Sequence, residues 1–106
     1  MNRDKQIERI AGMEDRLNGA LDAINSLTRA LDKYEKAAPG IKKLIRYYGS
    51  ASWLRDVSDD ASGVLPDGLK RGVLSEDGIY DMLERNRETL TRALAAVSKA
   101  LEEHTI

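Results

Sequence analysis

The chain has 106 residues, of which 33% are charged, with a formal net charge of −1 and no cysteine. Disulfides, thiolate catalysis and cysteine-based metal sites are therefore excluded, and the balanced charge gives no overall attraction to nucleic acid or to an anionic membrane. Because the charged N-terminus has no apolar signal core and no window approaches the roughly 18 apolar residues of a membrane span, we expect a cytoplasmic protein.

Residues 3–37 have the apolar periodicity of one long helix. The seam residues alternate at steps of three and four, which is the heptad pattern of a coiled coil or a bundle helix. They are Ile10, Met13, Leu17, Ala20, Ile24, Leu27, Leu31 and Tyr34. Leu21 on one side and Ala23 and Ala30 on the other widen the stripe, so the helix can contact more than one neighbour.

Pro39 is expected to end this helix, because the residue before a proline is disfavoured in helical geometry. A second, short helix is predicted over 40–48, with Gly49 as its C-terminal stop. Within the first helix, Gly12 and Gly19 lie beside the seam. They are compatible with the close approach of another helix or with a locally weak helix.

Ser50 is predicted to cap a third helix over 51–58, and residues 59–74 are expected to form a loop and a turn. Ser75 is the expected cap of a final long helix over 76–103. The apolar positions of this last helix recur at helical spacing. They are Ile79, Leu83, Leu90, Ala93, Val97 and Ala100, with Tyr80, Leu94 and Leu101 beside them.

These patterns predict an all-α fold in a single domain over residues 1–106. The first and last helices form an antiparallel pair, and the short helices and turns of the central segment pack across one end of it. The two stripes offer more apolar width than one helical hairpin uses. We therefore expect a three- to four-helix bundle that a second copy can complete.

Two sequence blocks of the central segment have a distinctive pattern. The first is YYGSASW over 47–53 with Asp56 after it, and the second is LPDGLKRGVLSEDGIYD over 65–81. Both blocks resemble the small bacterial proteins grouped as domain of unknown function 4298, and the resemblance extends from about Ile7 to Leu90. One departure lies at 60–62, where members often carry an acidic residue before the glycine. The resemblance implies a small cytosolic helical protein and brings no activity, substrate or catalytic residue.

The residues that could carry catalysis are few. His104 is the only histidine and lies near the C-terminus, where chains fray, so it is poorly placed for acid–base chemistry. Ser50 and Ser75 are explained as helix caps, and no nucleophile-elbow spacing occurs. We therefore expect no enzyme, no cofactor and no small-molecule substrate.

Acidic residues gather near the middle of the chain, at Asp56, Asp59, Asp60, Glu76 and Asp77. They lack the spacing of a calcium loop, so a solvated turn and a helix start are the expected structures and no metal is predicted. The Lys-Arg-Gly sequence at 70–72 precedes a helix start but lacks the glycine pattern of a phosphate-binding loop.

The function predicted from these observations is a non-enzymatic helical interaction or scaffold module that self-associates. Its expected partner is a second copy or another helical protein, with no membrane contact. The candidate interaction surface comprises Tyr47, Tyr48, Trp53, Arg55, Asp56, Lys70 and Arg71, since Tyr, Trp and Arg are favoured at interfaces. The alternative is single-stranded nucleic-acid binding by the basic and aromatic stretch from Lys42 to Arg55. The downstream acidic residues disfavour it, and so does the apolar face, which favours the core over the surface for Tyr48 and Trp53.

Overall fold

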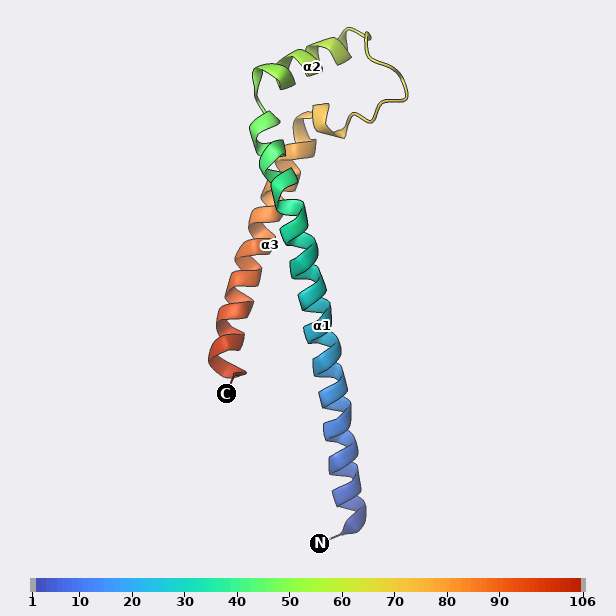
Figure 1. Cartoon of the computed structure of the whole chain (residues 1–106), viewed down its shortest axis with the longest axis vertical. Coiled ribbons are helices and arrows are strands. Elements are labelled where there is room, and N and C mark those ends of the chain that lie inside the picture. Colours follow the sequence, from blue (N-terminus) through green and yellow to red (C-terminus); the bar gives the residue numbers. More distant parts are fainter. Residues whose placement is uncertain (1, 106) are drawn as a thin grey trace. The chain divides into compact units, whose positions relative to one another are not determined.

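The computed structural model describes residues 2–105, and every regular element in that range is helical (Figure 1). Helix α1 spans Arg3–Tyr47, α2 spans Ala51–Ala61 and α3 spans Glu76–Glu103, with a short 3₁₀ turn, η1, at Gly72–Leu74. The predicted all-α class is confirmed for this part of the chain. The antiparallel pairing of the two long helices and the bundle stay predictions.

Helix α1 continues through Pro39, which corrects the predicted break between the helices 3–37 and 40–48. Pro39 has no N–H to donate to the carbonyl of Glu35, and a proline inside a helix costs about 3 kcal/mol. Two alanines, Ala37 and Ala38, precede it and have the highest helix propensity of any residue. The steric preference of a pre-proline residue is therefore outweighed by the long helical segment that precedes Pro39, and the helix continues to Tyr47.

The chain divides into two compact units, one up to Ile41 and one from Lys42 onward. The first unit is a single helical segment, and a single helix cannot cover its own apolar stripe. Eight large apolar side chains of this unit are between 48% and 59% exposed. They are Ile7, Ile10, Met13, Leu17, Leu21, Ile24, Leu27 and Leu31.

The second unit begins with the last turns of α1, and the chain turns at Gly49, whose φ of +78° lies in the left-handed region that glycine favours. Ser50 then caps α2, its hydroxyl accepting a hydrogen bond from the Trp53 N–H at 3.1 Å, as predicted. Helix α2 runs to Ala61, three residues past the predicted end at 58. Asp60, in this extra turn, pairs with Arg71 from the following loop.

Helix α3 begins after Ser75, the cap that the sequence predicts. The Ser75 hydroxyl accepts a hydrogen bond from the Gly78 N–H at 3.0 Å and donates one to the Gly72 carbonyl at 2.8 Å. The same side chain thus caps the N-terminus of α3 and links it to η1 by a hydrogen bond. The bounds of α3 are those predicted from the apolar spacing and the cap.

The core of the second unit is small and centres on Ile79, which is 2% exposed and is the most buried side chain of residues 2–105. Turn η1 packs against both α2 and α3. No helix within residues 2–105 combines the length and apolar composition that crossing a membrane requires. Because the core is this small, specific contacts, and not a large core, hold the central segment in place.

Candidate interaction site

Tyr47 and Asp56 join the end of α1 to α2. The Tyr47 hydroxyl donates a hydrogen bond to Oδ2 of Asp56 at 2.6 Å, in a partly buried position. This hydrogen bond, with smaller contributions from burial and from the negative charge of Asp56, raises the pKa of Tyr47 to about 12. The hydrogen bond thus links the end of α1 to α2 across the turn at Gly49.

Tyr48 and Trp53 form the aromatic part of the site. Their rings meet edge to face, with centroids 5.2 Å apart and an interplanar angle of 69°. The indole N–H of Trp53 donates to the backbone carbonyl of Val73 at 2.9 Å. Trp53 therefore ties α2 to η1, and its polar atom is already satisfied.

Arg71 holds the loop that follows α2. Its Nε pairs with Oδ1 of Asp60, and its two terminal nitrogens donate to backbone carbonyls of the loop. These carbonyls belong to Leu65, Pro66, Asp67 and Leu69, and the shortest bond is 2.6 Å, to Pro66. The planar guanidinium is suited to this work because its donors point outward in a fixed fork. One side chain thus organises the whole turn.

Arg55 and Lys70 complete the predicted surface and differ from the other members. Both are exposed, and neither forms an ion pair or hydrogen bond within residues 2–105. The other five predicted residues are partly buried in contacts within the central segment. The structure therefore assigns those five an architectural role, and partner binding by the surface stays a prediction.

Sequence reasoning weighed core packing for Tyr48 and Trp53, but it missed the structural contacts of Tyr47, Asp56 and Arg71. A signal was present for Arg71, because an arginine that closes a loop rich in proline and glycine is well placed to bind its free carbonyls. No comparable signal marked the contact between Tyr47 and Asp56, since the eight residues between them span a turn whose geometry depends on Gly49.

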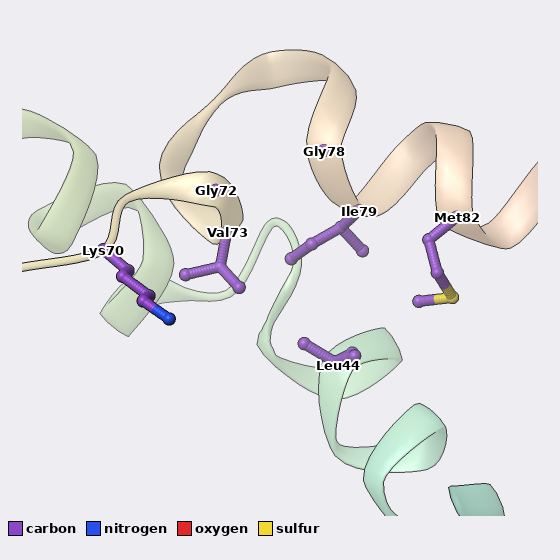
Figure 2. A pocket seen from close by; sticks show the side chains of 7 residues that line it. All are labelled: Leu44, Lys70, Gly72, Val73, Gly78, Ile79 and Met82. Atoms are coloured by element: carbon purple, nitrogen blue, oxygen red, sulfur yellow. The ribbon is translucent and has the colours of Figure 1, made fainter.

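An open cleft of about 390 Å³ lies beside the core of the second unit. Its lining is mainly apolar and comprises Leu44, Lys70, Gly72, Val73, Gly78, Ile79 and Met82. Figure 2 shows Leu44 of α1 facing Ile79 and Met82 of α3, with Lys70 at the other end. The cleft can accept an apolar side chain, and Lys70 is the charged residue of its lining.

The acidic residues do not assemble into a cation site within residues 2–105, where no group of three potential ligands comes together. Asp56 and Asp60 are instead hydrogen-bonded to Tyr47 and Arg71. His104 lies at the end of α3, exposed, with its Nε2 3.6 Å from the carboxylate of Glu103. The expected lack of metal and of catalysis remains a prediction.

The basic and the aromatic residues of the stretch proposed for nucleic-acid binding lie in different environments. Lys42, Lys43 and Arg46 are exposed on α1. Tyr48 and Trp53 pack against each other, which uses ring surface on which bases would have to stack. The alternative stays a prediction that this arrangement does not favour.

The comparisons with known proteins agree with the two sequence blocks. A family model, described as domain of unknown function (DUF4298), matches residues 10–96. The chain belongs to this family. No curated protein and no solved structure matches the chain. The contacts of Tyr47, Trp53 and Arg71 therefore describe how a DUF4298 chain builds its central segment, and the family description assigns no activity to them.

Proposed function

We propose that this DUF4298 chain is a cytoplasmic, non-enzymatic helical interaction module that self-associates through the apolar stripe of α1. The observation that carries the proposal is the exposure of that stripe. Eight large apolar side chains in its first unit are about half exposed in a single chain. Contiguous apolar surface of this kind marks interaction sites, and helices in proteins owe most of their stability to packing of such a face.

Part of the stripe is covered within the chain in this proposal, by antiparallel pairing with α3. Support comes from α3 itself, whose apolar side chains Leu90, Val97 and Leu101 are between 43% and 62% exposed. The lining of the cleft already brings Leu44 of α1 to Ile79 and Met82 at the start of α3. Pairing from that point onward would extend the existing contact along both helices.

Pairing within the chain cannot cover the whole stripe. Helix α1 has 45 residues and α3 has 28. An antiparallel α3 that starts beside Leu44 would end level with the middle of α1, leaving roughly its first 20 residues uncovered. Ile10, Met13 and Leu17 lie in that part. A second copy supplies the missing surface and makes a four-helix arrangement.

The non-enzymatic part of the proposal is supported by the central segment. Its distinctive polar side chains are engaged in structural contacts, Tyr47 with Asp56 and Arg71 with Asp60 and four carbonyls. Its cleft is lined mainly by apolar residues. Such a segment is suited to holding two helices in place.

Sedimentation equilibrium across the micromolar range tests the proposal. The wild-type chain is expected to be a dimer that dissociates on dilution, and the double variant L17D/I24D is expected to be a monomer because two charges enter the seam. The matched control N18D/N25D adds the same charges outside the stripe and should dimerise like the wild type. A wild-type chain that is monomeric at every concentration would remove the self-association claim.

A further inference from the structure

We infer that two copies of α1 pair in parallel and in register along their N-terminal halves, with Arg9 of each copy facing Glu14 of the other. This inference rests on the proposed function and specifies the orientation of the partner. The partner that covers the apolar stripe of α1 is a second copy of this chain. The argument comes from the continuity of α1, the heptad phase of its seam and the charges that flank it.

Helix α1 is uninterrupted from Arg3 to Tyr47, so the heptad phase is constant along it. One row of the seam contains Ile10, Leu17, Ile24 and Leu31, and the other contains Met13, Ala20, Leu27 and Tyr34. Isoleucine in the first row with leucine in the second favours two-stranded parallel pairing, and two layers at Ile24 and Leu27 have this pattern.

The flanks of the seam carry charge only at a few positions in residues 2–41. Arg9 and Arg16 lie on one flank, and Glu14 and Glu35 lie on the other. The remaining flank positions toward the middle of α1 are mostly apolar or small, including Leu21 and Ala23. Few charges therefore decide the orientation.

In a parallel, in-register pair the two opposite flanks meet, with an offset of five residues. Arg9 of one copy then faces Glu14 of the other, and twofold symmetry repeats the pair. Neither side chain forms an ion pair or hydrogen bond within residues 2–105, so both charges are available for a second copy. The pairing also closes with twofold symmetry and does not propagate.

In an antiparallel pair, each flank of the seam lies beside the same flank of the other copy. A register centred on the N-terminal part of α1 places Arg9 against Arg16, and longer overlaps place Glu14 against itself or against Glu35. Within residues 2–41 no antiparallel register brings opposite flank charges together. A longer overlap can place Glu14 against Lys42, and in that register the seam position that follows Ile45 is Tyr48, whose ring is packed on Trp53.

Charge reversal distinguishes these orientations. In the parallel pair, R9E and E14K each turn two attractive contacts into two repulsive ones, so each variant alone should dimerise about tenfold more weakly than the wild type. An equimolar mixture of the two variants restores both attractive contacts and should dimerise with wild-type affinity. Sedimentation equilibrium at low salt measures all three.

The controls are D15K and R29E, which reverse charges on the face of α1 opposite the seam and should leave the dimer unchanged. R9E that dimerises as tightly as the wild type or more tightly would overturn the parallel orientation, because an antiparallel pair gains an Arg16 contact. A mixture no tighter than its components would overturn it as well. A monomeric wild-type chain would instead contradict the proposed function.

A second readout is independent of charge and uses the natural lack of cysteine in the chain. In the parallel, in-register pair, residue 13 of one copy lies beside residue 13 of the other, within the Cα separation of about 4.4–6.8 Å that a disulfide requires. M13C should therefore form a disulfide-linked dimer on air oxidation, and D15C on the outer face should not. A dimeric M13C that fails to cross-link would overturn the inferred register.

Discussion

At Gly78 the backbone at the start of α3 lies close to the backbone of η1. A Cβ at this position would overlap the carbonyl oxygen of Gly72 and lie 2.7 Å from Oγ of Ser75. The obstacle is mainly backbone, which a side-chain rotation cannot relieve. A side chain at position 78 would therefore push η1 away from the start of α3.

Gly78→Ala is expected to destabilise the protein by about 3 kcal/mol, because the backbone of η1 must move away from α3. Chemical denaturation followed by circular dichroism measures the change. Gly19→Ala is the matched control, since no atom lies within 4 Å of its added Cβ, and it should be up to about 1 kcal/mol more stable. Equal effects of the two substitutions would refute the close contact.

Because of Tyr47, the stability of the central segment is expected to depend on pH in the alkaline range. Its pKa is raised from 10.0 to about 12, chiefly because its hydroxyl donates to Asp56. The stabilisation is fully present below pH 10, where the phenol is neutral in both states, and is lost as the pH rises through about 12. Carbon NMR of labelled tyrosine should show Tyr47 ionising about two pH units above an unperturbed phenol.

Tyr47→Phe removes the hydrogen bond to Asp56 and should cost about 1 kcal/mol at neutral pH. It should also abolish this loss of stability between pH 10 and 12. Tyr80 is a useful comparison, because its hydrogen bond to Glu84 also raises its pKa on an exposed face of α3. Ionisation of Tyr47 near pH 10 would contradict the contact with Asp56.

Arg71 is expected to control the order of the loop after α2. Arg71→Ala removes the donors for four backbone carbonyls and the partner of Asp60, and should cost about 2 kcal/mol. Arg71→Lys should recover little, because an ammonium group cannot reproduce the planar fork. Limited proteolysis within residues 62–71 measures the effect, and a loop that resists cleavage equally in all three proteins would show that Arg71 is dispensable.

At the scale of elements, α1 carries its main weakness at Pro39. The missing N–H and the ring of proline reduce helix stability at that point. Pro39→Ala should therefore stabilise α1 by about 3 kcal/mol locally. Amide hydrogen exchange around residues 35–43 should slow in the variant, and unchanged exchange would indicate that the helix is already interrupted there.

The elements themselves were largely predictable from local chemistry. Ser50 and Ser75 cap helices because their hydroxyls accept hydrogen bonds from N–H groups three residues later, and such caps are visible in a sequence. The continuation through Pro39 was not predictable from the pre-proline rule, which is local. The outcome depends on the helical segment before Pro39, which ends in the strong helix formers Ala37 and Ala38.

The candidate surface stays a prediction, and the structural contacts of its residues were not predictable from the sequence. Tyr47, Trp53 and Arg71 stand out by residue type, which is why they were assigned to an interaction surface. Their structural contacts join residues 9, 20 and 11 positions apart in sequence. Such contacts depend on how the loops fold back, and periodicity contains no information about that.

At the scale of the whole molecule, the heptad stripe of α1 is the dominant unexplained surface. The sequence predicts its residues and its width, and the structure leaves those side chains about half exposed in one chain. A stripe can be covered by α3 or by a second copy, and the same apolar spacing serves both. The difference lies in length, because α3 is 28 residues long and α1 is 45.

Hydrogen exchange measured at several protein concentrations tests most directly whether a second copy covers the stripe. We expect the amides of residues 7–20 to become more protected as concentration rises, because this part of α1 lies beyond the reach of an antiparallel α3. Amides around Ile79 should be equally protected at all concentrations. Protection of residues 7–20 that is independent of concentration would contradict self-association through α1.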